Sequence, residues 1–177
     1  MLFSEALLPG VKLIRLNRFN DDRGSFVKTF ARTPFLGASA PFDAAEEFYS
    51  LSKRGVIRGM HFQLPPHAHT KLIYCAIGSV LDVLLDLRAG PGYGRSASTL
   101  LSAEEPSVLL IPAGVAHGFL ALVDDSLMVY KTSTEHAPTH DSGVRWDTFG
   151  FGWGHANPII SERDRQHSSL ADFATPF

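Results

Sequence analysis

Short runs of apolar residues, each followed by turn-forming residues, extend along most of the 177-residue chain. In the segment 80–88, leucine and valine occupy alternate positions with mostly polar residues between them, which is typical of a strand with one buried face. Similar runs predict strands at 11–16, 25–30, 47–51, 55–63, 71–77, 96–101, 108–111, 116–123 and 127–132. Short strands at this spacing, interrupted by Gly, Pro and Asp, predict an all-β sandwich or barrel.

The C-terminal part of the chain has a different pattern. The stretch Ser161-Glu-Arg-Asp164 resembles a helix capping box, and residues 165–173 after it are predicted to continue as a helix. No internal repeat, low-complexity segment or linker divides the sequence. We therefore expect a single domain over residues 1–177, with short helices only at its periphery.

Charge and cysteine content narrow the class of function. The formal net charge is -2 and no basic block is present, so nucleic acid is not an expected partner. Cys75 is the only cysteine, which excludes an internal disulfide and favours a reducing compartment. No run reaches the roughly 18 apolar residues of a membrane helix, and residues 1–10 lack the basic start of a signal peptide. We expect a cytoplasmic protein without a membrane partner.

The segment Gly55–Gln63 predicts a short strand with a histidine in its middle. Alternation of side chains places Ile57 and His61 on one face and Arg58 on the other. A bulge at Gly59 would bring the arginine to the face of the histidine. A sheltered imidazole titrates near neutrality and can take and return a proton, whereas a histidine at a sheet edge can equally serve only to satisfy a hydrogen bond.

A second motif, Pro112-x-Gly114-x-x-His117 followed by a strand, resembles the cupin superfamily, whose members fold as small jelly-roll barrels with the site inside. Many cupins bind a metal through a His-x-His pair, a glutamate and this later histidine. His67 and His69 supply the pair, but Lys71 and Tyr74 stand where the glutamate is expected. A metal needs a third and a fourth ligand, so we expect no metal and interpret both histidines as solvated loop residues.

Several further segments resemble one family in their order and spacing, the dTDP-4-dehydrorhamnose 3,5-epimerases (RmlC). They are Arg23-Gly24, Gly55–Gln63, Lys71-Leu72, Asp82–Arg88, Leu101–Glu104, Ile111–Leu120, Tyr130-Lys131, Gly143–Trp146 and Pro158–Asp164. The resemblance implies a cupin-type jelly-roll β-barrel without metal or other cofactor. It also implies a homodimer that acts on a nucleoside-diphosphate 4-keto-6-deoxyhexose and inverts C3, C5 or both.

The resemblance implies four catalytic residues. A proton next to a ketone is weakly acidic, so its removal requires a base and a positive group where the enolate oxygen develops charge. The family pattern makes His61 the base, Asp164 its orienting partner and Lys71 the group near the oxyanion. Tyr130 would return a proton to the opposite face of the carbon, and inversion follows.

The resemblance also implies a set of substrate-binding residues: Arg23, Phe26, Lys28, Glu46, Phe48, Arg58, His117 and His136. In this assignment Phe26 stacks on the base, while Arg58 and His117 hold the pyrophosphate and the sugar. The family often has glutamate at position 28, glutamine at 46 and asparagine at 48, and usually tyrosine at 136. Because of these departures, we expect the sugar chemistry of the family to be retained and its preference for thymine to be changed.

Other functions remain open on the same residues. A related sugar 3,4-ketoisomerase would abstract the same proton and move the carbonyl, and a metal-binding or ligand-binding cupin would not catalyse at all. Each residue also has a purely structural interpretation. Asp164 can belong to the capping box, Tyr130 to the core, Lys71 to a solvated strand start, and His117 to the interior after a turn.

Overall fold

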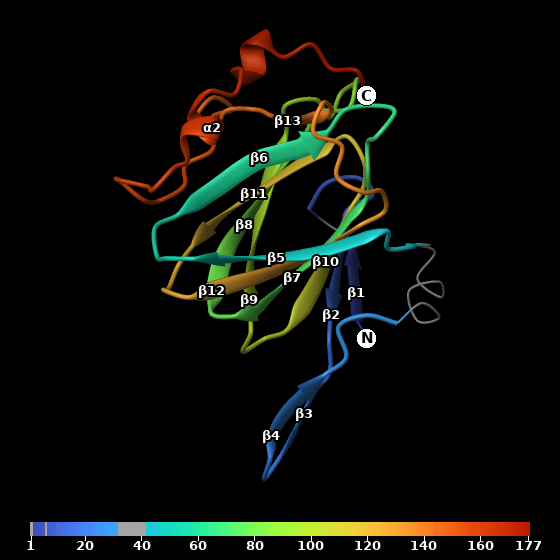
Figure 1. Cartoon of the computed structure of the whole chain (residues 1–177), viewed down its shortest axis with the longest axis vertical. Coiled ribbons are helices and arrows are strands. Elements are labelled where there is room, and N and C mark those ends of the chain that lie inside the picture. Colours follow the sequence, from blue (N-terminus) through green and yellow to red (C-terminus); the bar gives the residue numbers. More distant parts are fainter. Residues whose placement is uncertain (1, 6, 32–41) are drawn as a thin grey trace.

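Two antiparallel sheets face each other in the computed structural model, which describes residues 2–5, 7–31 and 42–177. The first sheet has the order β1 (Leu2–Glu5), β2 (Lys12–Arg15), β10 (Ser107–Ile111), β7 (Lys71–Ile77), β12 (Ser126–Thr132) and β5 (Glu46–Ser52). The second has the order β13 (Asp141–Gly143), β6 (Ile57–Gln63), β11 (Val115–Ala121), β8 (Ser79–Asp86) and β9 (Ser96–Ser102) (Figure 1). The expected all-β jelly-roll barrel is confirmed.

Most of the predicted strands form close to their expected bounds. The apolar runs correspond to β2, to β4 (Gly24–Val27) and to every strand from β5 to β12. The sequence pattern does not predict β1, β3 (Arg18–Asp21) or β13. These strands have only three or four residues each, which is too few positions for alternation to be recognised.

The space between the two sheets is filled by apolar side chains. Phe119, Leu84, Leu109 and Ile73 are almost completely buried there and belong to one cluster. Burial of a side chain of this size contributes about 1.5–3 kcal/mol relative to exposure. This cluster fixes the distance between the sheets, and Phe119 also forms part of the floor of the cavity described below.

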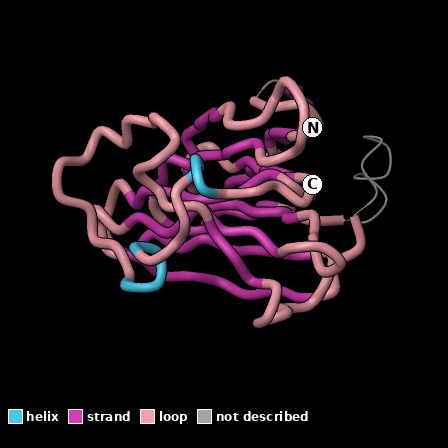
Figure 2. Tube along the Cα trace, turned by 90° about the horizontal axis from the view of Figure 1, so that it is seen from above, coloured by secondary structure: helices cyan, strands magenta, loops and turns pink. Residues whose placement is uncertain are grey.

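The C-terminal segment covers the outer face of the second sheet. Trp153 and Phe149 pack there against Ile57 and Leu85, so the central strands of this sheet are buried on both faces. Figure 2 shows that the two helical turns lie among the loops outside the strands. They are α2 (Glu162–Arg165) and a 3-10 turn (Leu170–Asp172). Among the described residues, no helix is long and apolar enough to cross a membrane.

The continuous helix expected over residues 165–173 is wrong. The chain leaves α2 at Gln166, and the carbonyl of Ser168 then accepts a backbone hydrogen bond from Arg145 at 2.9 Å. Ser169 starts the separate 3-10 turn by accepting a hydrogen bond from the backbone of Asp172. Pairing of the backbone with a distant segment therefore outweighs the helix propensity of a short sequence.

Strands β3 and β4 form a hairpin that projects away from the barrel (Figure 1). They pair only with each other, and both phenylalanines of the hairpin are exposed, Phe19 at 60% and Phe26 at 61%. Their rings lie 6.5 Å apart between centroids. A two-stranded ribbon with exposed aromatic rings has little stability of its own, and it presents an apolar surface to the outside.

Candidate active site

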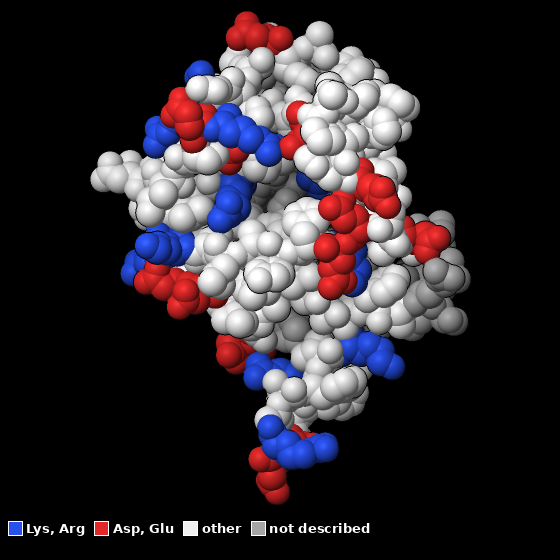
Figure 3. Space-filling view, in the orientation of Figure 1, with Lys and Arg blue, Asp and Glu red and all other residues white. Residues whose placement is uncertain are grey.

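A cavity of about 350 Å³ opens between the two sheets. It is lined by Glu46, Phe48, Ser50, Arg58, His61, Phe62, Gln63, His69, Lys71, His117, Phe119, Tyr130, Thr132, His136, Asp141 and Arg163. Half of these residues are among those predicted from the sequence. Figure 3 shows the hollow in the surface, with lysine and arginine side chains around it and a group of acidic side chains at its right.

A bulge in β6 turns Arg58 and His61 toward the same cavity. Arg58 and His61 are three residues apart on β6, whereas the residues that pair with them on β11, Phe119 and His117, are only two apart. Gly59 inside the bulge has a φ of +143°, and a Cβ atom there would lie 2.5 Å from the Cα atom of Gly118. The predicted bulge is confirmed. The expectation that Ile57 shares the face of His61 is wrong, because the extra residue turns Ile57 into the core.

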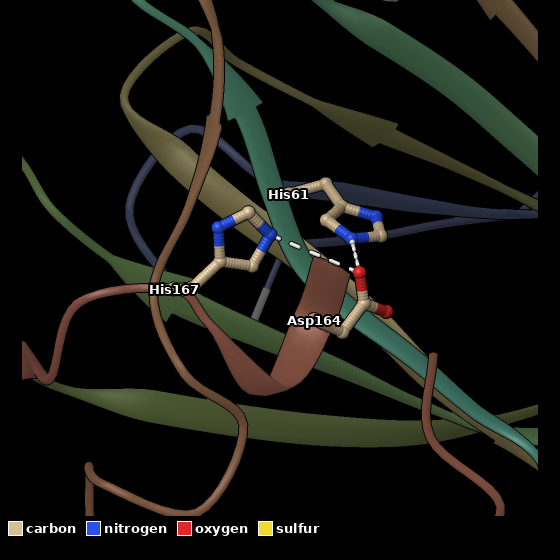
Figure 4. Close-up of side chains that lie close together, drawn as sticks. All are labelled: His61, Asp164 and His167. Atoms are coloured by element: carbon tan, nitrogen blue, oxygen red, sulfur yellow. Dashed lines mark hydrogen bonds and ion pairs between the residues drawn. The ribbon is translucent and has the colours of Figure 1, made fainter. Parts of the chain in front are cut away.

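His61 and Asp164 form a hydrogen-bonded pair (Figure 4). The imidazole Nε2 lies 2.8 Å from Asp164 Oδ1, and the backbone N–H of Gly59 donates to Oδ2 at 3.2 Å. The hydroxyl of Ser161 accepts from the backbone N–H of Asp164 at 3.1 Å. Ser161 therefore caps the helix, but the carboxylate of Asp164 pairs with His61 and Gly59, and its role as partner of a catalytic base remains a prediction. Its backbone is capped at the helix start, while its side chain points back to the histidine.

The segment before α2 is fixed to the start of β6. The backbone N–H of Ile57 donates to the carbonyl of Ile159 at 3.0 Å, and the N–H of Ile159 donates to the carbonyl of Gly55 at 2.9 Å. Two backbone hydrogen bonds thus hold residues about a hundred positions apart in the sequence next to each other. This pairing places the carboxylate of Asp164 beside the ring of His61.

The pKa values of this pair indicate which nitrogen is free. Burial lowers the pKa of His61, and the hydrogen bond to Asp164 only partly opposes this effect. Burial raises the pKa of Asp164, but its hydrogen bonds to His61 and Gly59 outweigh burial and leave the pKa below its ordinary value. At neutral pH the imidazole is neutral and the carboxyl is ionised. Because Nε2 donates to the carboxylate, Nδ1 carries the free electron pair.

Lys71, at the start of β7, is not the solvated residue that a strand start allows. Its Nζ donates to the backbone carbonyl of His61 at 2.9 Å and lies within the cavity lining. Burial lowers its pKa to about 8, while the carboxylates of Asp141 and Asp82 oppose the shift. The side chain therefore carries a positive charge at neutral pH in a place sheltered from water.

Tyr130 faces the same cavity from the opposite sheet. It lies on β12, and its hydroxyl is 3.1 Å from Ser50 Oγ on β5. The ring of Phe48 stacks on it at a centroid distance of 4.8 Å. Burial raises the pKa of Tyr130, against a smaller opposing effect of the hydrogen bond with Ser50. The phenol thus keeps its proton at neutral pH and has a neighbour that fixes its direction.

His117 forms a second histidine–carboxylate pair deeper in the cavity. Its Nε2 lies 2.7 Å from Asp82 Oδ2, and both side chains are almost fully buried. Burial raises the pKa of Asp82, and the charge of His117 opposes this shift. The interpretation of His117 as a buried histidine after a turn is correct, and the residue nevertheless lines the cavity.

At one end of the cavity, two predicted binding residues are held by bonds within the chain. Glu46 Oε2 accepts from the backbone N–H of His136 at 2.7 Å. His136 Nε2 lies 3.3 Å from Asp141 Oδ2, which also lies 2.9 Å from Arg163 Nη2. These hydrogen bonds and ion pairs hold the side chains that line this end of the cavity.

At the rim, the guanidinium of Arg58 is held in place by the edge strand β5. Its Nε donates to Ser52 Oγ at 3.1 Å, and its Nη2 donates to the carbonyl of Leu51 at 3.2 Å. These bonds leave other N–H groups of the guanidinium available to an anion, because the group has five N–H donors in all. A held and charged arginine at the mouth of a cavity suits a phosphate.

Comparison with known proteins shows the family of the chain. The family described as dTDP-4-dehydrorhamnose 3,5-epimerase matches residues 5–172. The chain belongs to this family. It is 37% identical to the dTDP-4-dehydrorhamnose 3,5-epimerase of Sinorhizobium fredii, over 100% of this chain and 93% of that protein.

Solved structures of the family share the fold. The structure of dTDP-4-dehydrorhamnose 3,5-epimerase from Bacillus anthracis with TDP and PPi bound has a TM-score of 0.91 and 34% identity, covering 95% of this chain and 98% of that chain. ChmJ from Streptomyces bikiniensis, a 3'-monoepimerase in complex with dTDP-quinovose, has a TM-score of 0.87 and 30% identity, covering 93% of this chain and 85% of that chain. The cupin-type barrel is thus confirmed.

Three residues that the epimerase family pattern assigns to binding lie away from the cavity. Arg23 and Phe26 belong to the projecting hairpin, and Lys28 follows it and is exposed. The guanidinium of Arg23 bonds to the carboxylate of Asp21, with Nη2 and Oδ2 2.5 Å apart, and Phe26 contacts Phe19. Within one chain the structure does not bring them to the other site residues, so their roles remain predictions.

Half of the cavity lining was not predicted from the sequence. Ser50 and Thr132 stand two residues from Phe48 and Tyr130, so alternation along β5 and β12 is a signal that could have found them. Arg163 is adjacent in sequence to Asp164. Phe62, Gln63, His69, Phe119 and Asp141 complete this set.

The two loop histidines of the epimerase differ from each other. His67 is exposed, as expected. The interpretation of His69 as solvated is wrong, because it lines the cavity and its Nδ1 accepts a hydrogen bond from Gln63 Nε2 at 3.1 Å. Burial lowers the pKa of His69 to about 4, so the ring is neutral. In the part of the chain that the structure describes, neither of them nor His117 belongs to a group of ligands suited to a metal.

Proposed function

We propose that this chain is an epimerase of nucleoside-diphosphate 4-keto-6-deoxyhexoses, of the dTDP-4-dehydrorhamnose 3,5-epimerase class. The observation that carries the proposal is the placement of base and acid. His61 lies on β6 of the second sheet and Tyr130 on β12 of the first, and both side chains line one cavity between the sheets. A sugar ring held between the sheets has one face toward each group.

The reaction follows from this placement. Nδ1 of His61 takes the proton from the carbon next to the 4-keto group, and Asp164 stabilises the imidazolium through Nε2. The electron pair moves onto the ketone oxygen, and the ammonium of Lys71 stabilises the enolate. The hydroxyl of Tyr130 returns a proton to the other face of the carbon. The centre is inverted, and no group other than the proton leaves or enters.

Five of the other predicted residues bind the substrate in this proposal. Arg58 at the rim contacts the pyrophosphate, and His117, oriented by Asp82, contacts the sugar. Glu46, Phe48 and His136 lie along the end of the cavity toward the nucleotide. The named relatives support dTDP as the carrier, since one of them is described with TDP and PPi bound.

We infer that the protein acts as a homodimer in which the hairpin of one chain reaches the cavity of the other. Two exposed surfaces support this inference. The hairpin presents Phe19 and Phe26, and the edge strand β5 presents Tyr49 at 69% and Leu51 at 51% exposure. Exposed edge strands need cover, and apolar side chains on them favour association. Light scattering that gave the mass of one chain at working concentration would contradict the dimer.

We further propose that residues 1–177 act as one domain in a reducing, cytoplasmic environment. The two clusters that flank the second sheet share its strands, which supports one cooperative unit. The single cysteine, Cys75, is buried, and burial raises its pKa to about 11. A buried thiol in its protonated form is a structural residue that does not form disulfides readily.

Deuterium exchange tests the function. The protein is incubated in heavy water with dTDP-, UDP-, GDP- and CDP-linked 4-keto-6-deoxyhexoses, and NMR reports which carbons gain deuterium and which are inverted. Exchange at C3, C5 or both, with inversion and an unmoved 4-keto group, supports the epimerase. A product with the carbonyl at C3 would identify the ketoisomerase instead. No exchange with any substrate would favour a cupin that only binds ligands.

A further inference from the structure

A second imidazole lies beside the proposed catalytic pair, and the proposed reaction does not use it. His167 Nε2 is 3.8 Å from Asp164 Oδ1, and its ring lies 5.7 Å from that of His61 between centroids, at an angle of 72° (Figure 4). This Nε2 is buried and has no hydrogen-bond partner. A distance of 3.8 Å is too long for a hydrogen bond. A buried polar atom without a partner requires an explanation.

The backbone around His167 is shaped to admit its ring. Gly143 on β13 pairs with His61 on β6, and a Cβ atom at position 143 would lie 2.5 Å from Nε2 and from Cδ2 of His167. Any side chain at this position would displace the imidazole. The glycine thus leaves the space in which His167 stands against the carboxylate of Asp164.

We propose that His61 Nε2, Asp164 Oδ1 and His167 Nε2 form a binding site for a divalent transition metal such as zinc. All three atoms lie within 4.8 Å of one another. Ligand atoms around a tetrahedral zinc ion with bonds of about 2.0–2.1 Å are about 3.4 Å apart, so the pair at 3.8 Å is close to the required spacing. Two imidazoles and a carboxylate are ligands that zinc accepts.

A cavity beside His61 and Asp164 offers space for a fourth ligand. This second cavity, of about 350 Å³, is lined by His61, Ser161, Arg163 and Asp164 among other residues. A water molecule there can complete four ligands, as in zinc sites with three protein ligands. Arg163 and Lys71 place positive charges near this site, and they limit the affinity for a cation.

The consequence of metal binding, which rests on the proposed function, is inhibition. With the metal on Nε2, the hydrogen bond between His61 and Asp164 is replaced by two metal–ligand bonds. The proton of the neutral imidazole then moves from Nε2 to Nδ1, the nitrogen that would accept the substrate's proton. The ring gains and loses no proton, but Nδ1 no longer has a free electron pair with which to accept the substrate's proton. The site differs from the cupin ligand set of His67, His69 and His117.

Metal binding to the full-length, chelator-treated protein tests the site directly. Calorimetry with zinc chloride, and the visible absorption of bound cobalt displaced by zinc, are expected to give one ion per chain. His167→Gln is expected to weaken zinc binding by at least about 10–100-fold, the loss caused by changing even an outer partner of a metal ligand. Gly143→Ala provides a second variant, which displaces the ring without changing any ligand. Circular dichroism confirms that both variants are folded.

His140→Ala is the matched control, because His140 and His67 form another close pair of imidazoles, with ring centroids 4.5 Å apart. This variant is expected to bind zinc as the wild type does. Absence of zinc binding by the wild type would overturn the site. Unchanged binding by His167→Gln, or loss of binding by His140→Ala, would overturn it as well.

Exchange measurements separate this inference from the proposed function. Zinc is expected to stop deuterium exchange of the substrate by the wild type and to leave exchange by His167→Gln nearly unchanged. Without metal, the two proteins are expected to catalyse exchange at similar rates. Zinc bound through His167 without any effect on exchange would overturn the inhibition. A protein that binds zinc through His167 but shows no exchange when free of metal would overturn the proposed function and support the site.

Discussion

The barrel cavity and the β3–β4 hairpin contain the two halves of the predicted binding site, and they differ in how completely one chain builds them. At the cavity, His61, Asp164, Lys71 and Tyr130 come from separate elements and are held by partly buried hydrogen bonds. In the hairpin, Phe26 is 61% exposed and contacts only its own ribbon partner Phe19 among aromatic residues of the described chain.

In the proposed dimer, the cavity carries out the reaction and the hairpin binds the nucleotide. Proton transfer needs fixed distances, and the core between two sheets supplies them. Nucleotide binding through a projecting ribbon needs a second surface, which in the proposed dimer is the cavity of a neighbouring chain. Changes in the cavity should therefore affect the reaction step, whereas changes in the hairpin should affect binding and depend on association.

The largest effect is expected from His61→Ala. Loss of the general base should lower deuterium exchange by about 10²–10⁴-fold, while thermal unfolding stays close to that of the wild type. His140→Ala, which removes an imidazole outside the cavity lining, serves as control. If His61→Ala exchanges within about threefold of the wild type, the base lies elsewhere.

Lys71→Met should lower exchange by about 10²–10³-fold, because a buried positive group at the developing oxyanion is removed. The wild type should also lose rate above a pH of about 8, since burial lowers the pKa of Lys71 to about 8 and the ammonium is neutralised there. The variant should lack this alkaline decline. Rates of exchange measured between pH 6 and 10 check both expectations, and an alkaline decline that persists in the variant would contradict the role of Lys71.

Tyr130→Phe should separate two steps of the reaction. Abstraction by His61 persists and gives exchange at one carbon, but inversion falls because the opposite face has no proton donor. Tyr49→Phe, on the exposed side of β5, is the matched control. NMR of the product stereochemistry distinguishes the outcomes. Unchanged inversion together with unchanged exchange would leave Tyr130 as a packing residue.

Arg23→Ala combined with Phe26→Ala should raise KM at least about tenfold with little change in kcat, because stacking on a base contributes about 1–3 kcal/mol to binding. Leu100→Ala, at another exposed apolar position, is the control.

Mixing the Arg23→Ala, Phe26→Ala double variant with His61→Ala tests whether the hairpin acts on the neighbouring chain. If hairpins cross between chains, mixed dimers contain one intact site and low-KM activity returns.

An absence of recovery after proven exchange of subunits would show that each hairpin serves its own chain. Native mass spectrometry of the mixture provides this proof. The outcome shows whether the site is completed by the hairpin of the partner or by the hairpin of the same chain.

The smallest effect is expected for nucleotide preference. Glu46 and Phe48 already have partners inside the chain, the backbone of His136 and the ring of Tyr130, and Lys28 lies outside the cavity. Base groups left unpaired lose about 1–3 kcal/mol each. We therefore expect calorimetry to show dTDP bound at most modestly better than UDP, GDP or CDP. Glu46→Gln with Phe48→Asn should increase the preference, and a wild-type preference of about a hundredfold or more would contradict the prediction.

The sequence by itself determined most of the strands and half of the residues that line the cavity. Strands such as Lys71–Ile77 carry their apolar pattern locally, so their bounds follow from adjacent residues. A glycine between Arg58 and His61 allowed a bulge to be expected from the sequence, and the close approach of Gly59 to Gly118 in the structure gives the reason for the glycine. The order of the family segments identified His61, Lys71, Tyr130 and Asp164.

The tertiary structure decided how these groups are brought together. Asp164 reaches His61 because backbone hydrogen bonds join Ile159 to the start of β6, a contact that no local pattern records. The same kind of long-range pairing, between Ser168 and Arg145, ended the helix expected over residues 165–173. His167 stands beside the pair only because Gly143 on another strand leaves it room. Local propensity is set by neighbouring residues, whereas these contacts depend on the packing of the whole chain.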